Sequence, residues 1–73
     1  MTVDEVIDVY RRVLETSAIG PDSDFFACGG ESLLATRVLS AVAHATGIEL
    51  SFTDFVLTPT PAALAKRLAS VLP

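Results

Sequence analysis

Apolar residues recur along this chain at the three- and four-residue spacing of amphipathic helices. The first such segment begins after Thr2, which with Glu5 matches a capping box. Its acids come early and Arg11 and Arg12 come late, as the helix dipole favours. This pattern predicts a first helix between Thr2 and Thr16. The side chains expected on its buried stripe are Val3, Val6, Ile7, Tyr10, Val13 and Leu14.

The helical pattern is lost from Thr16 to Gly30, where Gly20-Pro21-Asp22-Ser23 has the composition of a turn. A loop of about 15 residues is long for a compact domain, and such loops wrap the core or carry function. We expect this loop to wrap the core. Its expected anchors are Ile19, Phe25 and Phe26. Gly29 and Gly30 then permit a sharp turn, because glycine adopts backbone angles that other residues avoid.

A second helix of about four turns is predicted from Ser32 to Thr46, with Gly47 as a left-handed stop. Ser32 lies at the head of this helix, where unpaired N–H groups and the macrodipole favour a phosphate. The expected buried stripe is Leu34, Val38, Ala41, Val42 and Ala45. The face expected to meet solvent carries Leu33, Arg37, Ser40 and His44.

Two further patterns complete the chain. Ser51 or Thr53 can cap a third helix of barely two turns, which ends at Thr58 because the residue before a proline is pushed out of helical geometry. Thr60 then caps a fourth helix with Pro61 at its first position. We expect core positions at Phe52, Phe55, Leu64, Leu68, Val71 and Leu72, and solvent-facing positions at Lys66 and Arg67. The prediction is an all-α four-helix bundle, with a long loop between helices 1 and 2 and a short third helix.

Composition narrows the classes of function. The 73 residues suffice for one small domain, and the longest uninterrupted apolar runs are four residues, against about 20 for a membrane span. The N-terminus lacks the basic and apolar regions of a secretory signal, so we expect a cytoplasmic protein. One cysteine and one histidine exclude an internal disulfide and a Cys/His metal cluster, so no metal is expected.

The net charge of −4 is unevenly distributed. Residues 1–31 carry seven acids and two arginines, a net charge of −5, whereas residues 32–73 carry three basic and two acidic side chains, a net charge of +1. This balance argues against nucleic-acid binding, which requires a basic face. The predicted second helix contains Arg37 and no acid.

Ser32 is the candidate functional residue, and the local pattern alone is also that of a serine N-cap. As a catalytic nucleophile Ser32 would need a base, but His44 lies on the same predicted helix at a distance of about 18 Å. The sequence around Ser32 also lacks the second glycine of a nucleophile elbow. Cys28 has no evident activating neighbour and is expected to be a small buried hydrophobe. No catalytic residue is therefore expected.

The string DSDFFACGGESLLATRV, residues 22–38, closely resembles the core motif of peptidyl carrier proteins, the thiolation domains of nonribosomal peptide synthetases. GIELSFTDFVLTPTPAALAKRL, residues 47–68, resembles the usual sequel in that family, so the resemblance covers essentially the whole chain. It implies a single carrier domain over residues 1–73 with the four-helix carrier fold. It also implies that Ser32 carries 4′-phosphopantetheine from coenzyme A, with Gly30, Glu31 and Leu33 around the cofactor.

Three positions depart from the family pattern. Cys28 replaces a leucine, Glu31 replaces a histidine, and Pro61 stands where an aliphatic residue is common. Glu31 is acidic where acyl carriers of fatty-acid and polyketide systems have aspartate, which leaves the subclass open. Acyl carriers of fatty-acid synthesis typically have an acidic second helix, so the acid-free segment from Ser32 to Thr46 favours the peptidyl type.

The resemblance implies a carrier, not an enzyme, that presents an aminoacyl or peptidyl thioester to partner enzymes. The expected partners are a phosphopantetheinyl transferase, an adenylation enzyme, and condensation, tailoring or thioesterase enzymes. The expected docking residues are Leu33, Arg37, Phe55 and Val56. A monomer without nucleic-acid or membrane partners is expected. Two alternatives stay open: an acyl or aryl carrier of a polyketide or related pathway, and a helical adaptor that is never modified.

Overall fold

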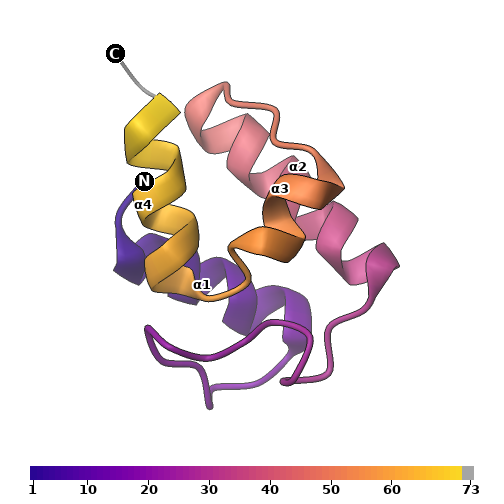
Figure 1. The fold of residues 1–73 in the computed structure, drawn as a ribbon. Coiled ribbons are helices and arrows are strands. Elements are labelled where there is room, and N and C mark those ends of the chain that lie inside the picture. Colours follow the sequence, from indigo (N-terminus) through magenta and orange to yellow (C-terminus); the bar gives the residue numbers. More distant parts are fainter. Residues whose placement is uncertain (72–73) are drawn as a thin grey trace.

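The computed structural model describes residues 1–71, which form four helices and no strand (Figure 1). The helices are α1 (Val3–Leu14), α2 (Ser32–Thr46), α3 (Phe52–Leu57) and α4 (Pro61–Val71). α1 packs against both α4 and α2, and the short α3 packs against α2. The all-α prediction is confirmed, including the long loop that leads from α1 to α2 along one edge of the molecule.

Local hydrogen bonds fix the helix ends, largely as the sequence predicts. The Glu5 N–H donates to Thr2 Oγ1 at 3.2 Å and the Thr2 N–H donates to Glu5 Oε1 at 2.9 Å, which completes the capping box. Gly47 ends α2 with a φ of 75°, a left-handed conformation that suits glycine. The Thr60 hydroxyl accepts the Ala63 N–H at 3.1 Å at the start of α4. Of the two candidate caps of α3, the structure uses Ser51.

Three fully buried aromatic rings form the centre of the core. Phe25, from the long loop, packs edge to face against Tyr10 of α1 and Phe55 of α3, with ring centroids 5.1 Å apart in both pairs. Ile19 is buried as well, and Phe26 is half-buried against the same cluster. The long loop therefore wraps the core, and its predicted anchors are confirmed.

The carbonyl of Pro59 joins the loop to the connection between α3 and α4. It accepts the Tyr10 hydroxyl at 2.8 Å and the Phe25 N–H at 3.1 Å. Burial, with a smaller contribution from Asp24, raises the pKa of the Tyr10 phenol well above its usual range, so the hydroxyl keeps its proton and donates. A second bond, from the Ala62 N–H to the Pro21 carbonyl at 3.0 Å, joins the first half of the loop to the start of α4.

Some predicted core positions are wrong. The buried face of α2 consists of Ala35, Val38 and Val42, so it is rotated from the predicted stripe and leaves Ala45 exposed. Phe52 and Val71 are each 43% exposed, because both lie in the terminal turns of their helices. The predicted position Leu72 lies outside the described residues.

Replacement of Tyr10 by Phe tests the bond to Pro59. Tyr10→Phe keeps the buried ring and removes one hydrogen bond, so the free energy of unfolding should fall by about 1 kcal/mol. Ser70→Ala removes an exposed hydroxyl whose hydrogen bonds stay within its own turn of α4, so it should change the free energy of unfolding by less than about 0.5 kcal/mol. Urea unfolding of the three proteins measures both effects, and equal stability of Tyr10→Phe and the parent would contradict this role.

Candidate functional site

Ser32 is the first residue of α2, not its cap. The N-cap is Glu31, with φ −140° and ψ 178°, and its side chain makes no capping hydrogen bond. Ser32 is exposed, and its hydroxyl has no hydrogen-bond partner among residues 1–71. The N-cap interpretation of Ser32 is therefore wrong, and its hydroxyl is available to an external reagent.

The first turn of α2 suits a phosphodiester on Ser32. No side chain caps its N–H groups, and no acid lies within this turn. These N–H groups and the positive end of the helix dipole stabilise negative charge. The exposed carboxylate of Glu31, next to Ser32, destabilises negative charge at the same place.

The chain reaches Ser32 through a compact turn that begins at Asp24. The Asp24 carboxylate accepts the N–H groups of Phe26 at 2.9 Å and Ala27 at 3.1 Å, and the Asp24 carbonyl accepts the Cys28 N–H at 3.0 Å. This is an Asx-type turn, which lets a short segment fold on itself without a helix or a strand. The segment directly before Ser32 is therefore held by its own hydrogen bonds.

The two glycines before Ser32 have different roles. Gly29 has a φ of 98°, a conformation that residues with a Cβ rarely adopt. Gly30 does not, but a Cβ there would overlap both the ring and the carbonyl oxygen of Phe25. The Gly30 N–H also donates to that carbonyl at 2.9 Å. The sequence predicts the turn, whereas the close approach of Gly30 to Phe25 is visible only in the structure.

An exposed apolar surface lies on α2 and α3. Leu33 is 62% exposed and Val56 is 45% exposed, and Arg37 is exposed on the same helix as Leu33. Phe55 is completely buried, so the prediction that it forms part of a docking face is wrong. Sequence reasoning missed Phe52, whose half-exposed ring lies 6.2 Å from that of Phe26. No local signal distinguished Phe52 from Phe55, because residues three apart lie on the same face of a helix.

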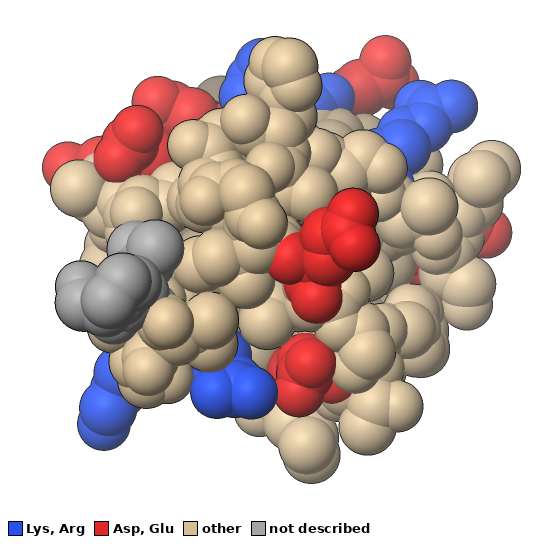
Figure 2. Space-filling model, turned by 90° about the horizontal axis from the view of Figure 1, so that it is seen from above, with Lys and Arg blue, Asp and Glu red and all other residues tan. Residues whose placement is uncertain are grey.

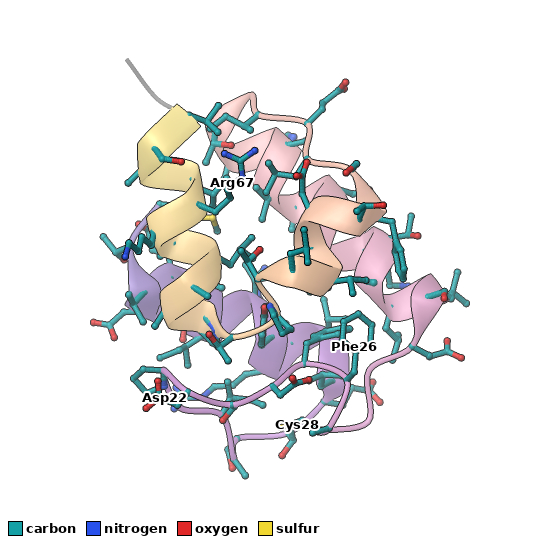
Figure 3. The ribbon with its side chains drawn as sticks, in the orientation of Figure 1. Asp22, Phe26, Cys28 and Arg67 are labelled. Atoms are coloured by element: carbon teal, nitrogen blue, oxygen red, sulfur yellow. The ribbon has the colours of Figure 1, made fainter. Side chains whose placement is uncertain are left out.

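Asp54 holds α3 in place. Its carboxylate accepts the N–H of Ser51 at 3.1 Å and the hydroxyl of Ser51 at 3.0 Å, and forms a 3.6 Å ion pair with Arg67. The Arg67 side chain comes from α4 (Figure 3). The bonds from Ser51, and more weakly the Arg67 charge, hold the pKa of Asp54 below its usual range. Asp54 therefore stays ionised near neutral pH and connects α3 to its neighbour.

The other reactive side chains are not assembled with Ser32. Cys28 is exposed at the outer edge of the loop (Figure 3), so the prediction that it is buried is wrong. His44 lies in the last turn of α2, twelve residues from Ser32, a separation of about 18 Å along the helix. Residues 1–71 contain no group of three or more side chains that could bind a metal ion. Even their longest helix, α2 with 15 residues, does not qualify as a membrane span.

Charges on the face seen in Figure 2 are interspersed. Acidic and basic side chains form small groups that are distributed over a largely uncharged surface. This face therefore has no continuous basic patch of the kind that binds a nucleic-acid backbone.

The chain is similar to proteins that carry a phosphopantetheine attachment site. The family described by that name matches residues 4–68. A dimodular nonribosomal peptide synthase of Bacillus subtilis is 43% identical over 61 residues, which cover 84% of this chain and 3% of the synthase. The chain thus spans a small part of this relative.

Two solved structures have the same fold. One is a complex of the phosphopantetheine transferase Sfp with coenzyme A and a peptidyl carrier protein, with 31% identity, a TM-score of 0.91, and coverage of 96% of this chain and 91% of that chain. The other is the McyG A-PCP complexed with phenylalanyl-adenylate, with 28% identity, a TM-score of 0.87, and coverage of 92% of this chain and 10% of that chain.

Replacement of Gly30 by Ala tests the contact with Phe25. The added Cβ must displace a buried ring or a backbone carbonyl, so Gly30→Ala should lower the free energy of unfolding by about 1 to 3 kcal/mol. Gly20→Ala is the matched control, because its Cβ would meet only the Ser23 hydroxyl at 4.0 Å. Thermal and urea unfolding measure the difference, and similar stabilities of the two variants would contradict the role of Gly30.

Proposed function

This chain belongs to the phosphopantetheine-attachment family, and we propose that the hydroxyl of Ser32 is the attachment point of the 4′-phosphopantetheine arm. The observation that supports this most directly is the exposed hydroxyl at the first residue of α2, which makes no capping hydrogen bond. Residues 1–73 act as one carrier domain of the peptidyl type. Gly30 and Glu31 set the approach to Ser32, and Leu33 lies directly after it.

Ser32 is the acceptor in the transfer reaction. Its Oγ forms a bond to the pantetheine-bound phosphorus of coenzyme A, the pyrophosphate P–O bond breaks, and the adenosine bisphosphate half leaves. The hydroxyl proton passes to a base of the transferase, because His44 lies about 18 Å away along α2. The transferase complex among the similar structures supports a phosphopantetheinyl transferase as this partner.

The chain then serves as a carrier and catalyses no step itself. The bound arm supplies a thiol that holds an aminoacyl or peptidyl group as a thioester for nonribosomal peptide synthesis. The protein contributes position, since tethering raises the effective concentration of the group at each partner enzyme. The adenylation-domain complex with an adenylate supports an adenylation enzyme as the loading partner. Condensation, tailoring or thioesterase enzymes are the partners that receive the group.

A small docking face lies on α2 and α3. It consists of Leu33, Arg37 and Val56, and Phe52 takes the place first assigned to Phe55. An exposed face of a few apolar side chains buries too little area for a permanent complex. Such a surface suits a carrier that must leave each enzyme after the reaction.

One observation favours a second candidate function. Glu31 is acidic where acyl carriers have aspartate, and the type-II acyl carrier protein BlmI from Streptomyces verticillus has a similar structure. An acyl or aryl carrier would use the same serine and arm. Comparison of loading with amino acids and with acyl or aryl acids distinguishes the two functions.

Replacement of Ser32 by Ala tests the attachment point. After incubation with coenzyme A and a phosphopantetheinyl transferase, the parent should gain one phosphopantetheine by mass spectrometry, and Ser32→Ala should gain none while remaining folded. Ser40→Ala, which removes an exposed hydroxyl from the same helix, should be modified like the parent. Modification of the Ser32→Ala protein at another residue would refute the assignment.

Charge changes on α2 test the docking face. Leu33→Glu and Arg37→Glu should slow aminoacyl loading by an adenylation enzyme about tenfold or more without lowering the melting temperature, since both side chains are exposed. Lys66→Glu, an equal charge reversal at an exposed position of α4, should leave the loading rate within about twofold. Equal loading rates for all variants would contradict this docking face.

A further inference from the structure

An open groove of about 190 Å³ runs along α2, on the stripe of the helix that begins at Ser32. The residues of α2 that line it share a three- and four-residue spacing, and the chain between α2 and α3 forms the opposite wall. The lining residues are Thr36, Leu39, Ser40, Ala43, Glu49 and Leu50. Thr36 lies one turn after Ser32, and its hydroxyl donates to the Ser32 carbonyl at 3.0 Å. The groove therefore starts one helical turn after the proposed attachment point.

The distance from Ser32 to the far end of the groove matches the length of the arm. A phosphopantetheine arm has about fourteen bonds between the serine oxygen and the thiol sulfur, which extend over about 17 Å at the rise per bond of an extended peptide. Ala43, at the far end of the groove, lies eleven residues after Ser32, or about 16.5 Å along α2. An extended arm that follows this stripe would place its thioester beside the end of the helix.

The groove also provides the contacts that such an arm can use. Leu39 and Leu50 are half-buried and offer apolar surface to its carbon chain, and the hydroxyls of Thr36 and Ser40 can bond its amides. Glu49 is the charged residue of the lining. It follows the C-terminus of α2 by three residues, is exposed, and has no ion-pair partner among residues 1–71.

We infer that this groove holds the loaded arm between visits to partner enzymes and that the Glu49 carboxylate favours an aminoacyl group by pairing with its α-ammonium. An N-acylated or fatty acyl group has no such cation. The inference rests on the proposed attachment at Ser32 and adds the class of cargo that the free carrier retains. The groove is smaller than the 300 to 1,000 Å³ typical of ligand pockets, so the arm is held loosely and can be released.

NMR spectroscopy of isotopically labelled protein tests this inference. The arm is installed from coenzyme A analogues that end in an amide-linked alanyl group or an amide-linked N-acetylalanyl group, at about pH 6.5, where the free amine is protonated. The alanyl arm should shift the backbone amide signals of Ser40, Ala43 and Glu49 more than the N-acetylalanyl arm does. Because both charges meet solvent, the bound-to-free ratios should differ by at most about fivefold.

Two variants distinguish the role of Glu49 from a general effect of charge. Glu49→Gln should remove the difference between the two arms, whereas Asp22→Asn should keep it. Asp22 is an exposed acid in the long loop near α4, remote from the groove (Figure 3). Identical shifts for the two arms, or an unchanged difference in Glu49→Gln, would overturn the inference. Mass spectrometry first establishes that Ser32 carries the arm. Failure of this modification would refute the proposed function and not the role of the groove.

Discussion

The position of Ser32 depends on one buried residue, Phe25. Its ring packs edge to face against Tyr10 and Phe55, its N–H donates to the Pro59 carbonyl, and its own carbonyl accepts the Gly30 N–H. The side chain is thus held by the core, and the backbone is held on both sides. Because Gly30 precedes Ser32 by only two residues, the start of α2 cannot shift without disturbance of the aromatic core.

This arrangement separates a rigid base from an exposed hydroxyl. Residues that position Ser32 are buried or hydrogen-bonded, whereas Ser32 itself makes no side-chain bond among the described residues. A carrier needs both properties, since a partner enzyme must find the attachment point in a fixed place and yet reach the attached group. The loop and α1 contribute many of the buried side chains that stabilise the fold. The exposed faces of α2 and α3 remain available for contact with other proteins.

Local signals made most of the fold predictable, and long-range contacts account for what was missed. The caps Thr2 and Thr60 and the stop at Gly47 follow from neighbouring residues, and the motif around Ser32 identified the family. The exact buried face of α2 could not be predicted from neighbouring residues, because the other helices decide whether Leu34 or Ala35 is covered. Likewise, the burial of Phe55 over Phe52 and the contact of Gly30 with Phe25 require the path of the loop, which no local pattern encodes.

The charges are also divided between the two parts of the molecule, the N-terminal part and α2. Seven of the nine acids lie in residues 1–31. In contrast, α2 contains no acid, and its Arg37 is an exposed cation. Partners that approach α2 therefore meet few carboxylates, apart from Glu31 beside Ser32 and Glu49 beyond the far end of the helix. These two acids flank the path of an arm that follows α2. Since a carboxylate would repel a phosphate on Ser32 but attract an ammonium at the opposite end, their placement would favour an arm that carries its positive charge away from the proposed attachment point.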